Sequence, residues 1–274
     1  MDKIFSGQFR EVLILKNIIN KFPIPKTCIE FGAYDGITNA NTFYFWKNKG
    51  FKSLLIEADP NLFKLLEKNA NQNCIIVNDF VSRKNSLNKI IKKYNFPKKI
   101  GILSIDIDSN DFQIFKQIDH SSTYIVIIEF NNQFPVWADY EDPKDYIVFR
   151  HSALAVVKFA TKNGYRLLDI RGSNLILVNQ NNLVLPASMY PNKLEDCFDY
   201  QEQKRACKDI RIIGSKFTTN AKIFSQRPGV LLRIKKFFFQ LTLVVNYSLR
   251  KKPIPSNKIP ECCKKRIVDA GLYI

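Results

Sequence analysis

Five short apolar runs in this sequence each end in an acidic residue, and stretches with helical periodicity separate them. Such runs are typical of strands buried on both faces, and strands that alternate with helices favour a doubly wound parallel sheet. In such a sheet, ligands bind outside the carboxyl ends of the strands. We therefore expect one ligand-binding edge that carries the acids at the strand ends: Glu30, Glu57, Asp79, Asp106, Asp108 and Glu129.

The order of the expected elements agrees with this α/β class. Strands are expected at the start of the segment 27–36 and over residues 53–57, 74–79, 100–108 and 124–129. Helices are expected over residues 7–22, 41–47, 61–69, 86–94, 112–115 and 151–163. Two further runs, 165–170 and 174–179, flank a Gly-Ser pair that is typical of a hairpin turn, so an antiparallel pair completes the sheet.

Prolines accumulate from residue 186 onward, and the periodic pattern weakens there. We therefore expect a first domain over residues 1–185 and a mostly helical, basic extension over residues 186–274.

The segment 27–36 is the strongest indication of a small-molecule site. Gly32 and Gly36 follow the first strand four positions apart, and glycine allows the backbone to approach a ligand closely. Glu57 ends the second strand 21 positions after Gly36. A carboxylate at that place can accept hydrogen bonds from both hydroxyls of a ribose.

The net charge of +17 is unevenly distributed, because residues 226–266 carry eleven Lys or Arg and one acid, which is ten of the seventeen charges. The rest of the chain is close to ordinary for a lysine-rich protein, so the charge does not favour nucleic acid as a partner. The sequence also lacks the Asn/Asp-Pro-Pro-aromatic segment that nucleic-acid amino-methylating enzymes use.

Within the extension, residues 237–249 form an uncharged run between basic clusters. Spanning a bilayer takes about 20 apolar residues, so the run is too short to cross one. Residues 229–252 suit a helix at an anionic membrane surface, and a helix packed on the main domain or in a dimer interface is the alternative. The oligomeric state stays open.

The six cysteines have no spacing typical of zinc ligands, and two of them, Cys28 and Cys74, lie in expected strands. Free thiols in strands are typical of a reducing compartment. The first residues also lack the apolar run of a signal peptide. We therefore expect a cytoplasmic protein, with peripheral contact to the inner face of a membrane as the alternative suggested by the extension.

Four segments, in this order and spacing, resemble the S-adenosylmethionine-dependent methyltransferases of the FkbM type: 29–36, 41–42, 55–60 and 104–111. The likeness runs from about residue 7 to residue 185. It implies a Rossmann-like sheet of seven strands with the last one antiparallel, and S-adenosylmethionine as cofactor. The last segment departs from the usual Lys-Ile-Asp-Val-Glu-Gly-x-Glu of the family at Ser104, Asp108, Ser109 and Asp111.

On this resemblance, the glycines would admit the methionine part of the cofactor and Glu57 would bind its ribose. Asp79 and Phe80 would contact the adenine, and Glu30 and Asp106 would border the amino-acid end. The complete set of expected cofactor residues is Glu30, Gly32, Ala33, Asp35, Gly36, Asn41, Glu57, Ala58, Asp79, Phe80 and Asp106.

A hydroxyl acceptor needs a group that takes its proton, because the sulfonium leaving group is already activated. The candidates are Asp108, Glu129 and His151, with Asp111 and Asn131 nearby in sequence. An Mg²⁺ ion held by several of these oxygens is the alternative that we do not favour, because oxygen clusters at strand ends also arise from helix capping and solvation. His120 precedes the fifth strand and is expected in a turn at the opposite edge.

We therefore expect a methyltransferase that transfers a methyl group from S-adenosylmethionine to a hydroxyl of a sugar or glycan precursor. The alternatives are a non-catalytic binding or scaffold protein with the same fold, and a nucleic-acid methyltransferase.

Overall fold

The computed structural model describes residues 7–81, 86–107, 111–134, 136–141 and 150–202. The chain divides into two compact units. The first consists of residues 1–129 and 157–197, and the second of residues 130–156 and 198–274. The predicted extension falls mostly outside the described residues, so its boundary at residue 186 and its helical character stay predictions.

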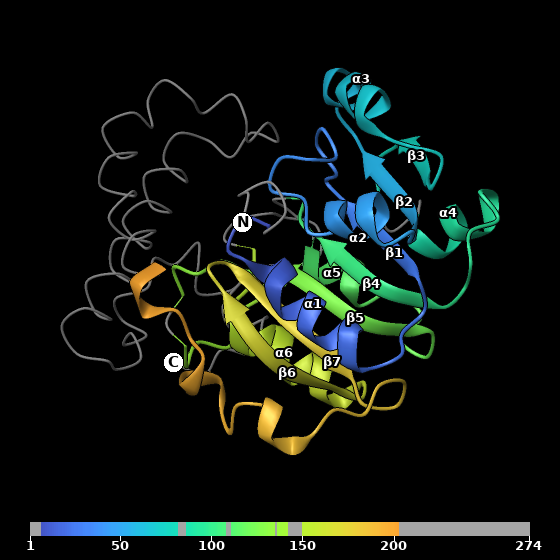
Figure 1. Ribbon diagram of the computed structural model, residues 1–274. Coiled ribbons are helices and arrows are strands. Elements are labelled where there is room, and N and C mark those ends of the chain that lie inside the picture. The colour runs from blue at the N-terminus through green and yellow to red at the C-terminus, as the bar shows by residue number, and fades with distance from the viewer. Residues whose placement is uncertain (1–6, 82–85, 108–110, 135, 142–149, 203–274) are drawn as a thin grey trace, which may run out of the picture. The chain divides into compact units, whose positions relative to one another are not determined.

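A seven-stranded sheet forms the centre of the first unit (Figure 1). Its order is β3-β2-β1-β4-β5-β7-β6, and β7 pairs antiparallel with both of its neighbours. The predicted α/β class and the antiparallel last strand are therefore confirmed. The strands are β1 Thr27–Phe31, β2 Lys52–Glu57, β3 Cys74–Asn78, β4 Ile100–Ile105, β5 Thr123–Glu129, β6 Tyr165–Arg171 and β7 Asn174–Asn179.

The six predicted helices are also present, and two short 3-10 helices that the sequence pattern did not indicate follow the sheet. The first helix begins at Glu11 rather than near Gly7, because Arg10 takes a left-handed conformation with φ 70°. The helices are α1 Glu11–Lys21, α2 Phe43–Asn48, α3 Pro60–Asn69, α4 Leu87–Lys93, α5 Asp111–Phe115 and α6 Ala153–Lys162, with η2 Ala187–Met189 and η3 Leu194–Asp196.

Helices cover both faces of the sheet, as a doubly wound fold requires (Figure 1). On one face, Val12, Leu15 and Ile18 of α1 are fully buried in a cluster with side chains of α2, α3 and the central strands. On the other face, Phe115 of α5 makes an edge-to-face contact with Phe159 of α6, at 5.6 Å between ring centroids. Alternate residues of each central strand thus face opposite apolar layers.

The start of α3 shows how local sequence sets an element next to the ligand edge. Pro60 takes the first turn of the helix, as predicted, where its missing N–H would be unpaired anyway. The Asp59 carboxylate accepts hydrogen bonds from the backbone N–H groups of Asn61 and Leu62, at 2.7 and 3.3 Å. This cap starts α3 with only two residues between it and the end of β2.

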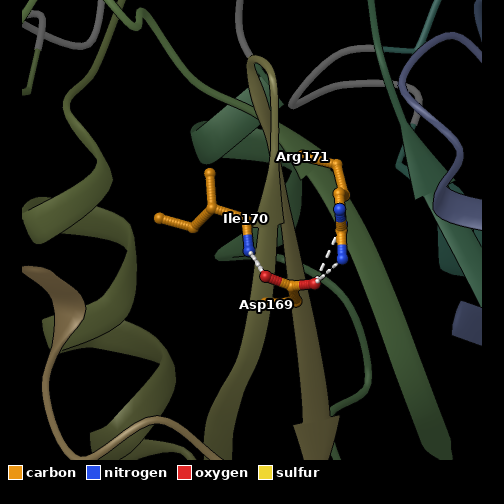
Figure 2. A network of polar contacts seen from close by, with 3 residues as sticks. All are labelled: Asp169, Ile170 and Arg171. Carbon is orange, nitrogen blue, oxygen red and sulfur yellow. Dashed lines mark hydrogen bonds and ion pairs between the residues drawn. The ribbon is translucent and has the colours of Figure 1, made fainter. Parts of the chain in front are cut away.

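The predicted hairpin joins β6 to β7, with a register irregularity between Leu167 and Asp169. Beside it, the Asp169 carboxylate accepts a hydrogen bond from its neighbour's backbone N–H, at 2.8 Å, and pairs with Arg171, at 2.7 Å (Figure 2). Such a solvent-exposed pair contributes only about 0–1 kcal/mol, so buried β7 and not this contact holds the hairpin in place.

Cys28 and Cys74 carry free thiols, as predicted, and Cys28 is buried while Cys74 is half-buried. Among the described residues, every helix is too short or too polar to cross a bilayer.

Candidate functional site

A cavity of about 540 Å³ lies outside the carboxyl ends of the first five strands, and every residue that lines it belongs to the first unit. Its wall is formed by the residues that end or follow these strands, by the segment 38–41 and by single residues of the N-terminal segment and α3. They are Gln8, Glu30, Phe31, Gly32, Ala33, Tyr34, Thr38, Asn39, Ala40, Asn41, Ile56, Glu57, Ala58, Leu62, Asp79, Phe80, Val81, Asp106, Ile107 and Glu129.

The charge of this cavity has one sign. Five of its lining residues are acidic: Glu30, Glu57, Asp79, Asp106 and Glu129. Within the described part of the chain, no Lys, Arg or His lines it. A cavity lined by carboxylates favours a positively charged ligand and repels an anionic one.

Glu30 is buried at the carboxyl end of β1 and is largely engaged by the chain itself. One carboxylate oxygen accepts a hydrogen bond from the Asn41 backbone N–H at 2.7 Å, and the other accepts from the backbone N–H (3.3 Å) and the hydroxyl of Thr42. These two residues directly precede α2, so a carboxylate from β1 occupies the amides at the N-terminus of that helix.

Burial raises the pKa of Glu30 to about 7, against the lowering effect of its hydrogen bonds from Thr42 and Asn41, and the charge of Asp106 raises it further. The family resemblance implied that Glu30 contacts the cofactor. The structure adds a second role, because its carboxylate accepts hydrogen bonds from the amides before α2.

Gly32 is required by the protein's own backbone as well as being part of the cavity wall. Its φ is +66°, and a Cβ at this position would lie 1.9 Å from the carbonyl oxygen of Asp106. The chain that leaves β4 therefore passes directly against the loop that leaves β1. This close approach brings Asp106 to the same cavity as Gly32.

Asp35 and Gly36 were predicted to contact a cofactor, but they are not among the lining residues. The Asp35 carboxylate accepts hydrogen bonds from the backbone N–H groups of Ile37 and Thr38, at 2.9 and 2.7 Å, and from the Thr38 hydroxyl. Burial acts to raise the pKa of Asp35, but these hydrogen bonds outweigh it and lower the pKa. Gly36 donates its N–H to the Ala33 carbonyl at 2.7 Å. Both residues thus stabilise the loop after β1 without lining the cavity.

Glu57 ends β2 with a carboxylate that organises two backbone segments. Oε2 accepts a hydrogen bond from the Tyr34 N–H, and Oε1 accepts one from the Asp59 N–H, both at 2.8 Å. A carboxylate has about four acceptor positions, so these bonds leave capacity on each oxygen. Glu57 is therefore held rigidly at the cavity wall with acceptor positions that a pair of hydroxyls could use.

Next to Glu57, the cavity wall is apolar. Phe80 is 55% exposed and Tyr34 is 45% exposed, so both side chains have accessible surface, and both residues line the cavity. Ala58, Leu62 and Val81 line the same region. Asp79 accepts a hydrogen bond from the Phe80 N–H at 2.8 Å, so its side chain holds the turn that presents the ring.

Asn41 brings a buried acceptor to the wall. Its side-chain nitrogen donates a hydrogen bond to Ser104 Oγ at 3.1 Å, while its side-chain oxygen has no partner although the residue is only 3% exposed. The two residues lie in segments that the family resemblance also singled out. Ser104, which stands where the family usually has Lys, thus holds the Asn41 side chain.

Three carboxylates gather at the ends of β4 and β5. Asp106, Asp111 and Glu129 each have an oxygen within 4.8 Å of the oxygens of the other two. Asp106 and Glu129 line the cavity, whereas Asp111 is fully buried as the first residue of α5 and accepts a hydrogen bond from the Ile107 N–H at 2.8 Å. The structure thus brings Glu129 and Asp106 together, as the shared strand edge predicted.

Of the other predicted catalytic residues, the structure describes only His151, which does not line this cavity. His151 belongs to the second unit, is 2% exposed and forms an isolated bridge with Glu141. Its carbonyl accepts a hydrogen bond from the Asn131 N–H at 2.9 Å. Asp108 lies outside the described residues, as does the segment 229–252 that was predicted to contact membrane.

His120 lies in a turn before β5, as expected, but it is half-buried rather than a surface residue. Its ring packs against Phe115, Phe159 and Tyr165, and burial lowers its pKa. His120 is therefore part of an aromatic cluster that supports the fold.

Several lining residues were missed from the sequence. Gln8, Thr38, Asn39, Leu62 and Val81 reach the cavity because the loop after β1 and the starts of α1 and α3 converge there. Their spacing relative to the strand ends carries no periodic signal. Tyr34 is the exception, since its place between Gly32 and Gly36 could have indicated it.

No protein-family model and no curated protein matches the sequence of this chain. Among solved structures, the glycopeptide N-methyltransferase MtfA complexed with S-adenosyl-L-methionine is similar, with 10% identity, a TM-score of 0.35, and coverage of 68% of this chain and 90% of that chain. A SAM-dependent methyltransferase from Aquifex aeolicus has 12% identity and a TM-score of 0.37, with coverage of 65% and 94%. Similarity at this level carries no argument about activity.

Proposed function

We propose that this protein is an S-adenosylmethionine-dependent methyltransferase, and that its acceptor is a hydroxyl of a sugar or glycan precursor. The observation that carries the proposal is the cavity at the carboxyl ends of the strands, whose charged residues are all acidic. S-adenosylmethionine combines a sulfonium and an ammonium with one carboxylate. Its net positive charge suits this wall.

The competing class of ligand for such a sheet is a dinucleotide, and two features count against it. A dinucleotide places its pyrophosphate on the free amides of a helix N-terminus. Here Glu30 accepts hydrogen bonds from the Asn41 and Thr42 amides that precede α2. A pyrophosphate would also meet five carboxylates without a basic side chain among the described lining residues.

The residues present fit the parts of S-adenosylmethionine. Glu57 retains acceptor positions for the two ribose hydroxyls, and Phe80 with Leu62 offers apolar surface to the adenine. The backbone carbonyl of Asp106 lies against Gly32 in the loop after β1, and the residue lines the cavity, where its charge would pair with the ammonium. Glu30 contributes less to this pairing than the sequence suggested, because the chain itself uses both of its oxygens.

When bound, S-adenosylmethionine supplies a methyl group that is already activated by the sulfonium. The protein then has to align the acceptor and take up a proton. Glu129 lines the cavity close to Asp106, which supports the proposal that its carboxylate would receive the hydroxyl proton as the new C–O bond forms. Asp108 and His151 stay predictions for this role.

We do not assign a metal ion to the three clustered carboxylates. Asp111 is fully buried and holds the Ile107 N–H, and only Asp106 and Glu129 of the three line the cavity. Two cavity carboxylates are sufficient for a proton acceptor and a partner for the ammonium. The oxygen acceptor, and its identity as a sugar or glycan precursor, rest on the family resemblance.

The substitution Glu57→Gln is expected to weaken S-adenosylmethionine binding at least about tenfold, measured by isothermal titration calorimetry. The amide keeps one acceptor but loses the negative charge and half of the acceptor capacity, and hydrogen bonds to charged groups contribute about 1.5–3 kcal/mol.

Glu67→Gln is the matched control, because Glu67 is an exposed residue of α3 that does not line the cavity. It should bind S-adenosylmethionine like the wild type. Wild-type protein that binds no S-adenosylmethionine would support the non-catalytic alternative, and equal affinity of both variants would remove Glu57 from the site.

A further inference from the structure

The edge of the sheet opposite the cavity carries a concentration of lysines. The neighbouring strands β2, β1 and β4 run parallel, so their amino ends lie at one edge. Lys26 directly precedes β1, Lys52 begins β2, and Lys98 and Lys99 directly precede β4. All four side chains are exposed. We refer to these four residues as the lysine edge.

Two hydrogen bonds to backbone carbonyls hold the backbones of three of these lysines close together. The Lys52 N–H donates to the Lys26 carbonyl at 3.0 Å. The hydroxyl of Thr27, the residue after Lys26, donates to the Lys99 carbonyl at 2.7 Å. Neighbouring strands lie about 4.8 Å apart, so the backbones that carry these lysines lie within a Debye length of each other.

Nothing in the described part of the chain neutralises this charge, because none of the four lysines forms an ion pair. Lysines in the last turn of a helix have an ordinary explanation, since they interact favourably with the helix dipole. Lys21, Lys92 and Lys93 at the ends of α1 and α4 belong to that group. The four lysines of the lysine edge precede or begin strands, so the dipole does not account for them.

We propose that the lysine edge binds an anionic lipid bilayer. Lysine is a strongly hydrated point charge on a flexible stem, which suits diffuse attraction to anionic headgroups. Nucleic-acid surfaces usually add arginines for base edges or exposed aromatic rings for stacking. The lysine edge contains neither, and the exposed large apolar side chains of the described residues lie elsewhere: Tyr34, Leu65, Phe80, Val184 and Tyr200.

This surface goes beyond the proposed methyltransferase activity and has a consequence for it. The lysine edge and the cavity lie at opposite ends of the same strands, and β4 spans six residues, which is about 20 Å. With the lysine edge against headgroups, the cavity of the first unit opens on the side away from the bilayer. The cofactor and the acceptor then reach it from the aqueous phase.

The test uses the full chain with Lys26, Lys52, Lys98 and Lys99 all replaced by glutamine. Each basic residue near an anionic membrane contributes about fivefold in binding. Co-sedimentation with vesicles of equal parts phosphatidylcholine and phosphatidylglycerol should therefore weaken at least about thirtyfold. Wild-type binding should fall at high salt and be absent for phosphatidylcholine alone.

The matched control replaces four exposed lysines that lie neither at a strand start nor in the helix turn before one, Lys64, Lys89, Lys158 and Lys193, by glutamine, which changes the net charge equally. Its vesicle binding should fall less than about threefold. The basic extension is the same in both variants, so the difference reports on the lysine edge.

Equal losses in the two variants, or no loss in either, would contradict the proposal. The wild type could instead bind duplex RNA more tightly than the anionic vesicles. If only the lysine-edge variant lost that RNA binding, the surface would be assigned to nucleic acid. Circular dichroism melting of each variant separates lost binding from lost folding, and unchanged S-adenosylmethionine binding separates this surface from the cavity.

Discussion

Gly32→Ala is expected to lower the free energy of unfolding by about 2–4 kcal/mol. Alanine at the left-handed φ of +66° costs about 1 kcal/mol by itself. The added Cβ would also lie 1.9 Å from the Asp106 carbonyl oxygen, so the ends of β1 and β4 would have to separate. Forcing atoms into a packed region costs a further 1–3 kcal/mol, roughly.

Gly50 provides the matched control for this prediction. Its φ is +65°, but a Cβ there would have no atom within 4 Å. Gly50→Ala should therefore cost only the backbone part, about 1 kcal/mol. Urea unfolding followed by circular dichroism gives both values, and a Gly32→Ala cost no larger than that of Gly50→Ala would contradict the close approach of the two strand ends.

Glu30→Ala is the second substitution with a large expected effect, about 3 kcal/mol or more. It would leave three buried donors without their acceptor: the backbone N–H groups of Asn41 and Thr42 and the Thr42 hydroxyl. Each unpaired buried donor costs about 1–3 kcal/mol. Glu67→Ala, at an exposed position of α3, should have almost no effect in the same urea titration.

Glu30 also predicts a pH dependence with a definite sign. Burial raises the pKa of Glu30 from 4.5 to about 7, so the folded state binds more protons than the unfolded state between these values. The contribution of this group to stability is therefore greatest below pH 4.5 and decreases as the pH rises to about 7. Glu30→Gln, which cannot ionise, should remove this decrease, and an unchanged pH profile of the urea midpoint would contradict the assignment.

The fold was predictable because it depends on patterns among residues that are close together in the sequence. Apolar runs bounded by acids, glycines and prolines gave all seven strands and six helices. The predicted ends of helices and strands were less accurate where a single residue departs from the pattern. The first helix starts after Arg10, which takes a left-handed φ, and β4 ends at Ile105 rather than at residue 108.

The candidate site was predictable as a location, because parallel strands bring their terminal acids to one edge. The partners of those acids were not predictable, because they depend on contacts between distant segments. Glu30 accepts hydrogen bonds from the amides before α2, and Glu57 accepts them from Tyr34 and Asp59, although both glutamates were predicted only as ligand contacts. Asp35 likewise serves its own loop.

Calorimetric titration of the wild-type protein with S-adenosylmethionine and, in the same buffer, with NAD⁺ is the most direct test of the acidic cavity as a site for a cationic methyl donor. S-adenosylmethionine should bind saturably, because five carboxylates and no described basic side chain line the cavity. NAD⁺ should give no measurable binding. Binding of NAD⁺ as tight as that of S-adenosylmethionine would contradict the account.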